Sequence, residues 1–141
     1  MSKIIFSGLL PLENIPDYQE QIRDLLSQAV AHGDGEMSIE QIIASLTDGR
    51  MVLVCAIEDT GKMQNALALQ IIDYPNQRAL LAAYAAGRNL KQHRETVIDI
   101  AKATECSVIE ARTNPQVARL LRLFCKEKFY HAYVMSRFRV E

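Results

Sequence analysis

The chain carries no excess of charge of either sign. Among its 141 residues, 16 are Lys or Arg and 17 are Asp or Glu, which gives a formal net charge of −1. A nucleic-acid-binding protein needs a basic excess to meet the phosphates, and a polybasic membrane-surface protein needs one to meet anionic lipids. The charge balance therefore argues against both classes, and neither nucleic acid nor a membrane is expected as a partner.

Long apolar runs are also absent. No stretch approaches the roughly 20 apolar residues of a transmembrane helix. The opening stretch MSKIIF is interrupted too early for a signal peptide, so none is expected and a cytoplasmic location is predicted. Hydrophobic residues still make up 49% of the chain, which is enough to build the core of one domain over residues 1–141.

Cysteine is rare as well. Cys55, Cys106 and Cys125 are odd in number and far apart, and no CxxC pair or Cys/His cluster occurs. A zinc site is therefore not expected, and no other metal site is assigned. Each cysteine stands in apolar sequence, so all three are predicted to be small buried residues in a reducing compartment.

The first third of the chain predicts one strand and two helices. Residues 3–10 form a short apolar run that is typical of a strand. Pro16 opens a helix at a position where its missing N–H is not needed, and the cluster at 33–35 ends that helix. Ser38 and Gln41 have the spacing of a capping box, which predicts the start of a second helix.

The hydrophobic period then changes to that of strands. Apolar runs at residues 51–57, 66–72 and 78–86 are separated by turn residues and predict an antiparallel meander. Asn65 is placed in the first of these turns. Both alternating sets of the second and third runs are apolar, so both faces should be covered by helices, or one face by another subunit.

The last third predicts helix, strand, helix and strand. A helix over 90–105, with Val97, Ile98 and Ala101 facing inward, precedes a short strand at 107–111. Asn114 and Pro115 open the next helix. Its core face is predicted to hold Val117, Leu120, Leu121 and Phe124. Alternating residues at 133–140 predict a final strand, which completes an α/β (α+β) order of elements.

The three histidines are predicted to be structural or solvated. His93 lies in the third helix beside Arg94 and Glu95, and a solvated helix face is favoured over a catalytic role. His32 stands at a helix end, where a histidine suits the helix dipole. His131 is predicted to be a surface turn residue.

The acidic candidates for a general base are few. Glu110 and Arg112 flank one residue on a strand, so both point to the same face. An ion pair of Glu110 with Arg112, or with Arg78, is favoured over a general base that acts through water. Glu58 and Asp73, at strand ends, are further candidates.

Basic residues gather on the polar side of the last predicted helix. They are Arg119, Arg122, Lys126 and Lys128. A solvated face is the favoured interpretation, and a phosphate- or partner-binding patch is the alternative.

Two stretches near the C-terminus carry a resemblance to a known family. VIEARTNPQVARLLRLF is similar to the strand and following helix of the GNAT family of acyl-CoA-dependent N-acyltransferases, and IDIAKATECSVIEA is similar to the preceding helix and its return to the sheet. The order of elements also resembles this family over nearly the whole chain. The resemblance implies a GNAT-like fold, with a mostly antiparallel mixed sheet flanked by about four helices.

The same resemblance implies a degenerate site. The family binds the pyrophosphate of acyl-CoA with a loop Q/R-x-x-G-x-G/A, whose bare backbone presents N–H groups. The corresponding segment here reads AAGRNLK, so only Gly87 keeps the pattern and Arg88 and Asn89 add bulk. Leu121 stands where the family often has a general-acid tyrosine. No catalytic residue is assigned, and Gly87, Arg88 and Asn89 are cofactor-binding candidates only if CoA binds.

Three functions are open at this point. The favoured one is a non-catalytic GNAT-fold protein that has no cofactor and acts through a protein partner or self-association. It is similar to small GNAT-like proteins of tailed bacteriophages, which implies a virion component or accessory protein in a bacterial host cytoplasm. The alternatives are a diverged acyl-CoA-dependent N-acetyltransferase that uses acetyl-CoA and a module that binds CoA thioesters without turnover. Fold alone does not separate them.

Overall fold

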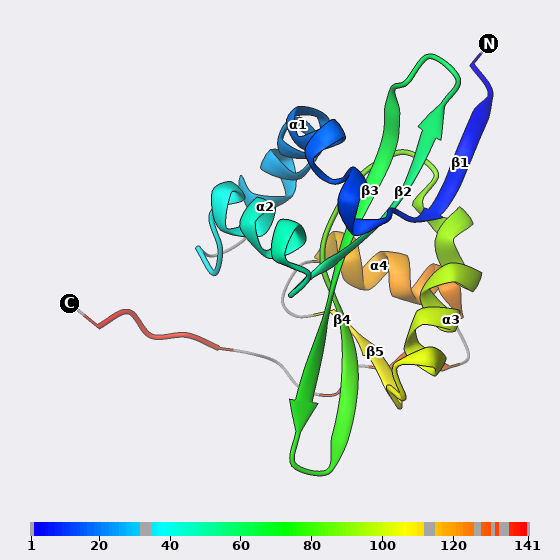
Figure 1. Cartoon of the computed structure of the whole chain (residues 1–141). Helices are drawn as coiled ribbons and strands as arrows, with labels where there is room; N and C mark the ends of the chain where they lie inside the picture. The colour runs from blue at the N-terminus through cyan, green and yellow to red at the C-terminus, as the bar shows by residue number, and fades with distance from the viewer. Residues whose placement is uncertain are drawn as a thin grey trace.

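The structure of the chain, a computed structural model, describes residues 2–31, 35–111, 115–125, 128–130, 132 and 136–140. These residues form one five-stranded sheet with helices on both sides (Figure 1). The strands are β1 (Ile4–Leu9), β2 (Val52–Glu58), β3 (Met63–Tyr74), β4 (Gln77–Gly87) and β5 (Val108–Glu110). The α-helices are α1 (Gln19–Ala31), α2 (Ile39–Asp48), α3 (Arg94–Ala103) and α4 (Pro115–Phe124). Short 3-10 helices are η1 (Leu12–Asn14), η2 (Pro16–Tyr18) and η3 (Leu90–His93).

The sheet has the strand order β1-β2-β3-β4-β5. Neighbouring strands from β1 to β4 are antiparallel, and β5 runs parallel to β4. The predicted α+β class with a mostly antiparallel mixed sheet is therefore confirmed. The meander predicted from the three apolar runs is β2, β3 and β4.

Helices cover both faces of this sheet. On one face, α1 and α2 bury Ile22, Leu26 and Leu46 completely. On the other face, α3 and α4 bury Val97 and Val117 completely. Full burial of each such aliphatic side chain stabilises the fold by about 1.5–3 kcal/mol. The sheet thus has the helix-covered arrangement that the apolar sequences of β3 and β4 predicted.

Helix α2 begins and ends at the residues expected from the sequence. The Ser38 hydroxyl accepts a hydrogen bond from the Gln41 N–H at 3.2 Å, and the Gln41 side chain accepts one from the Ser38 N–H at 2.9 Å. This capping box satisfies N–H groups that a helix start leaves without partners. Gly49 follows the helix with a φ of 84°, a left-handed conformation that glycine adopts without strain.

The helix predicted over residues 90–105 is divided in two. The 3-10 helix η3 comes first, and α3 follows it directly. Val97 and Ala101 are buried as predicted, whereas Ile98 is half-buried. The helix ends just before Glu105, whose φ of 61° is left-handed.

The last predicted strand is wrong for the part that the structure describes. Residues 136–140 lie in neither a helix nor a strand, and 133–135 lie outside the described residues. Figure 1 shows the end of the chain running away from the sheet. Phe138 and Val140 are 90% and 92% exposed, so neither side chain packs against the sheet or the helices. Arg137 instead donates to a carboxylate oxygen of Glu36 at 3.0 Å.

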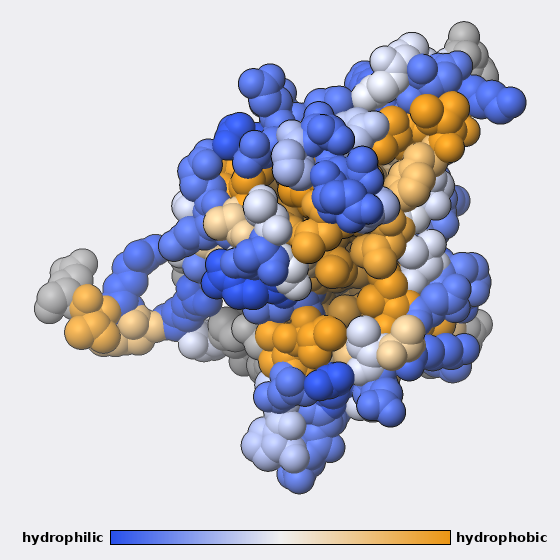
Figure 2. Space-filling view, viewed as in Figure 1, coloured by the Kyte–Doolittle hydropathy of each residue, from blue (hydrophilic) through white to orange (hydrophobic). Residues whose placement is uncertain are grey.

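Some large apolar side chains stay exposed on the body of the domain. On the edge strand β1, Ile5 is 65% and Leu9 is 45% exposed, and Leu12 of η1 is 50% exposed. Figure 2 shows apolar residues also gathered over the middle of the viewed face, with polar residues around them. None of the helices in the described part of the chain has the length and apolar character of a membrane span.

Candidate functional site

Among the residues that the structure describes, strand β4 has a partner on its β5 side over only part of its length. The parallel register joins Ala79 to Val108 and Leu81 to Glu110, and it stops there. From Ala82 to the end of β4, no pairing with β5 follows. The chain leaves this open half of β4 and turns into η3, against which α4 packs. The three cofactor-binding candidates lie at this exit.

Gly87 is a glycine because β3 approaches it closely. Its φ is 98°, and a Cβ atom there would lie 2.4 Å from the carbonyl oxygen of Gln64 and 2.6 Å from Cα of Asn65. Neither backbone atom can give way cheaply, so a side chain at residue 87 would separate the two strands. The contact with β3 alone is sufficient reason for glycine at this position.

Arg88 and Asn89 form an exposed turn that is already hydrogen-bonded. The Arg88 N–H donates to the Gln64 carbonyl at 3.3 Å. The Asn89 carbonyl accepts from the Gln92 N–H at 3.2 Å and from Gln92 Nε2 at 2.8 Å, and the φ of Asn89 is 60°. An Arg88 N–H that bound a phosphate would first have to leave Gln64.

Asn65 is a buried polar residue that the sequence placed in a turn. That prediction is wrong, because β3 starts at Met63, two residues before Asn65, and the Asn65 side chain is completely buried. Ala56 lies opposite Asn65 and Ile57 lies opposite Met63, so Gln64 is an extra residue in β3. Such a bulge interrupts the ladder. Here the Asn65 side chain takes the place of a ladder acceptor, since its Oδ1 accepts from the Ala56 N–H at 3.0 Å.

His93 is the second buried polar group of this region, and its predicted solvated position is wrong. It is 0% exposed, and its Nε2 lies 2.7 Å from Oδ1 of Asn65. It precedes Val97 by four residues, so it shares the core face of the helix that follows. Burial lowers the pKa of His93 from its usual value, which keeps the ring neutral near pH 7. Its Nδ1 has no hydrogen-bond partner among the described residues.

A set of side-chain amides connects the same turn to the sheet on the solvent side. Gln92 Nε2 donates to Oε1 of Gln64 at 3.2 Å, and the Ser7 hydroxyl donates to Oε1 of Gln92 at 3.2 Å. These contacts join η3 to β3 and β1. At the other end, Arg94 Nε donates to the Phe124 carbonyl at 2.5 Å, which joins the start of α3 to the end of α4.

The predicted core face of α4 is confirmed for three of its four residues. Val117, Leu120 and Phe124 are buried, and Leu121 is half-buried against the same apolar cluster. Leu121 has no group that could protonate a leaving thiolate. Asn114 and the side chain of Pro115 lie outside what the structure describes.

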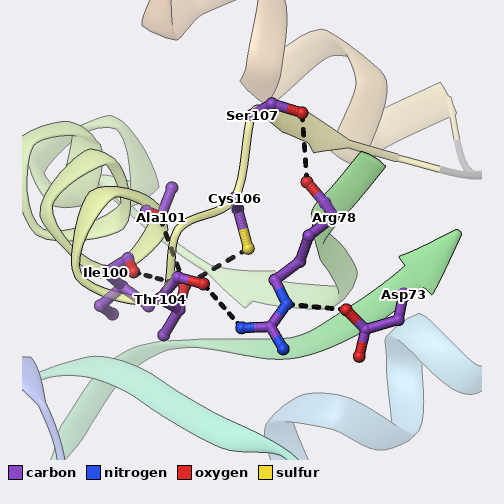
Figure 3. A network of polar contacts seen from close by, with 7 residues as sticks. All are labelled: Asp73, Arg78, Ile100, Ala101, Thr104, Cys106 and Ser107. Atoms are coloured by element: carbon purple, nitrogen blue, oxygen red, sulfur yellow. Dashed lines mark hydrogen bonds and ion pairs between the residues drawn. The ribbon is translucent and has the colours of Figure 1, made fainter. Parts of the chain in front are cut away.

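The acidic residues form structural contacts. The predicted pair of Glu110 with Arg78 is wrong, because Arg78 Nε pairs with Asp73 Oδ1 at 2.7 Å and Glu110 accepts from the Tyr74 hydroxyl at 2.7 Å. Figure 3 shows how Arg78 also donates to the Thr104 carbonyl, at 2.9 Å. Arg78 thus holds the turn between α3 and β5 against the β3–β4 hairpin. Arg112 lies outside the described residues, and Glu58 is buried at the end of β2.

The remaining residues that the sequence singled out are the cysteines, the basic residues near the C-terminus and two histidines. Cys55 is buried as predicted, and burial raises the pKa of its thiol to about 12, whereas Cys106 and Cys125 are half-buried. Arg119, Arg122 and Lys128 are exposed, which fits a solvated face. His32, His131 and Lys126 lie outside the described residues. Within the residues that are described, no group of three His, Cys, Asp or Glu side chains could hold a metal ion.

Comparison with known proteins defines the class of fold. No protein-family model matches the chain, and no curated protein matches it in sequence. Among solved structures, an aminoglycoside N-acetyltransferase in complex with CoA matches with a TM-score of 0.66 at 13% identity, over 99% of this chain and 96% of that one. The ribosomal-protein-alanine N-acetyltransferase of Brucella melitensis matches with 0.65 at 13% identity, over 96% and 100%. A Trypanosoma brucei acetyltransferase matches with 0.62 at 12% identity, over 96% and 99%.

The chain therefore has a GNAT-like fold over nearly all of its length. Identities this low show the fold alone, and the activity of these similar structures is not transferred with it. The comparisons give no support to a phage origin.

Proposed function

We propose that this chain binds an acyl-CoA thioester at the open end of β4 and is a diverged N-acyltransferase. The observation that supports this most is the extent of the match to acetyltransferases, one of them with CoA bound, which spans 99% of this chain and 96% of that chain. The five strands and the helices on both faces of the sheet, which surround the proposed site, are present among the described residues.

The open half of β4 supplies a place for an extended ligand. From Ala82 onward, no strand in the described part of the chain pairs with β4 on its β5 side, and the N–H and C=O groups of an unpaired strand edge are suited to bonding with amides. The chain of CoA contains amides, and its pyrophosphate would lie near the exit of the strand. Gly87, Arg88 and Asn89 are the proposed contacts there, with Arg88 as the charged group.

Binding and turnover are proposed to be weak. The Arg88 N–H is engaged by Gln64, so fewer free donors face a phosphate than in a glycine-rich loop. A hydrogen bond to a charged acceptor contributes about 1.5–3 kcal/mol, so each missing donor weakens binding by about tenfold or more. Leu121 offers no proton to a leaving group, and general acid catalysis commonly contributes about a hundredfold or more.

A second candidate is a non-catalytic protein that acts through protein contacts. It is favoured by the exposed apolar side chains Ile5, Leu9 and Leu12, and by the internal hydrogen bonds that already occupy the exit of β4. In this role the fold would be a scaffold for a protein partner or for self-association. A virion role for it has no independent support.

Calorimetric titration with acetyl-CoA distinguishes the diverged acyltransferase from the non-catalytic protein. Under the first proposal, saturable binding appears between about micromolar and millimolar concentrations, and Arg88→Ala weakens it about tenfold or more. Lys102→Ala, which removes an exposed cation near the end of α3 that is farther from η3, is the matched control and leaves binding unchanged. Acetylation of polyamines and lysine peptides is then measured. The absence of binding at millimolar acetyl-CoA would reject the first proposal and leave the second.

A further inference from the structure

We propose that Asn65 and His93 form a buried positioning pair that sets the conformation of the turn at residues 88–93. The pair acts through the backbone of this turn and touches no ligand itself. Its consequence for acyl-CoA binding rests on the proposed function above. Its effect on the turn does not, and can be measured in the protein alone.

The orientation of the Asn65 amide is fixed by two backbone groups. The Ala56 N–H requires an oxygen, which lies at 3.0 Å, and the Arg88 carbonyl requires a donor, which is Nδ2 at 2.7 Å. Exchange of the amide oxygen and nitrogen would set donor against donor and acceptor against acceptor. Oδ1 therefore faces Ala56 and His93.

This orientation determines the tautomer of His93. Because Oδ1 of Asn65 can only accept, the hydrogen of the 2.7 Å contact belongs to Nε2 of His93. The ring is neutral, and its Nδ1 is a bare acceptor without a partner among the described residues. A buried acceptor without a partner is costly. An apolar side chain would fill this place on the face of Val97 and Ala101 without that cost, so the histidine must supply something that an apolar residue cannot.

What His93 supplies is a second attachment for the turn. Asn65 binds the backbone of Arg88 at the start of the turn and the ring of His93 at its end. The neighbouring Gln64 carbonyl holds the Arg88 N–H. Between these attachments, the exposed residues include Asn89 in its left-handed conformation. One buried side chain of β3 thus determines which backbone groups the exposed turn presents.

The first experiment measures amide hydrogen exchange in the protein without ligand. His93→Leu should accelerate exchange of the Arg88 and Gln92 N–H groups about tenfold or more relative to those of β2 and β3. His93→Gln, whose Nε2 can still donate to Asn65, should restore most of the protection. Leu46→Ala, on the opposite face of the sheet, controls for global destabilisation because it should not act selectively on the turn.

Ring nitrogen shifts of His93 in the unaltered protein provide a measurement that needs no variant. The proposal requires hydrogen on Nε2 at neutral pH. Hydrogen on Nδ1, or unchanged relative exchange of the turn in His93→Leu, would overturn it.

The second experiment compares acetyl-CoA affinity in the same variants. His93→Leu should raise the dissociation constant about tenfold or more, and His93→Gln should stay close to the unaltered protein. If the turn exchanges faster in His93→Leu and affinity is unchanged, the positioning of ligand contacts by this pair is wrong. If the unaltered protein does not bind acetyl-CoA, the proposed function fails, and the exchange data still decide the role of the pair.

Discussion

Glu105 has a backbone conformation that residues with a side chain seldom adopt. It is exposed, with a φ of 61° in the turn between α3 and β5. In the left-handed region a Cβ atom costs roughly 1–2 kcal/mol, and glycine avoids this cost while it adds entropy to the unfolded chain. We expect Glu105→Gly to raise the free energy of unfolding by about 0.5–1 kcal/mol, measured by urea unfolding.

Lys102→Gly is the matched control for this prediction. Lys102 is exposed within α3, where glycine costs up to about 1 kcal/mol relative to a good helix former. If Glu105→Gly is less stable than the unaltered protein, as Lys102→Gly is expected to be, strain at residue 105 is not significant.

The buried His93 predicts how stability depends on pH. Burial lowers its pKa in the folded protein, whereas in the unfolded chain it titrates near 6.5. Below pH 6.5 the unfolded chain therefore binds a proton that the folded protein does not, and stability falls as the pH falls toward the folded pKa. The expected slope approaches about 1.4 kcal/mol per pH unit for one proton.

Urea unfolding between pH 7.5 and 5.5, roughly the range where histidine titrates, measures this slope. His93→Gln should flatten it, and His32→Gln and His131→Gln should not. A slope that survives in His93→Gln would assign the effect to other groups.

The residues of the site were only partly predictable. Gly87 was identified as the one glycine of its segment, but the reason for it, the approach of Gln64, depends on how β3 and β4 pair. His93 could have been placed correctly, because it lies four residues before the buried Val97. The burial of Asn65 could not have been predicted. Its partners are Ala56 in β2 and Arg88 and His93 after β4, and contacts between separate elements leave no periodic pattern in the sequence.

Ser38 provides a test at the scale of one element. Its hydroxyl and the Gln41 side chain form the capping box at the start of α2. Removing an N-cap hydroxyl costs about 1 kcal/mol, so Ser38→Ala should lower the free energy of unfolding by that amount. Thermal or urea unfolding gives the value.

Ser27→Ala is the control, because the Ser27 hydroxyl donates to the Arg23 carbonyl within α1 and such a bond does not stabilise a helix. It should be neutral or slightly stabilising, since alanine is the better helix former. Equal losses in both variants would contradict a specific role for the cap.

Helices and strands with a strong hydrophobic period were predicted well from the sequence, whereas the pairing between strands was not. α2 follows from its cap and its apolar face, and β2 to β4 follow from their continuous apolar runs. The alternation at 133–140 has the same appearance as a strand, but a strand also needs a neighbouring strand to pair with, and residues 136–140 are not part of one. The register that leaves half of β4 without β5 is likewise a property of two strands and of the helix between them.

At the scale of the whole molecule, covering both faces of the sheet uses all four helices. Nothing is left in the described part of the chain to cover the outer edge of β1, which pairs only with β2. Ile5 and Leu9 project from this edge strand and are 65% and 45% exposed. An open edge with exposed apolar side chains is a surface that another chain can pair with.

We therefore propose that the protein self-associates through β1, and light scattering tests this. The unaltered protein should have at least twice the mass of one chain at high concentration, because pairing of two β1 edges would bury Ile5 and Leu9 of both copies. Ile5→Lys and Leu9→Lys should each shift the mass toward that of one chain, since a charge on an edge strand opposes pairing. Leu123→Lys is the control, because Leu123 is also exposed, at 64%, but lies on helix α4 and not on a strand edge, so this change should leave the mass unchanged. A single-chain mass for the unaltered protein would contradict pairing of β1, and equal effects of all three lysines would show that general surface hydrophobicity, not this edge, drives the association.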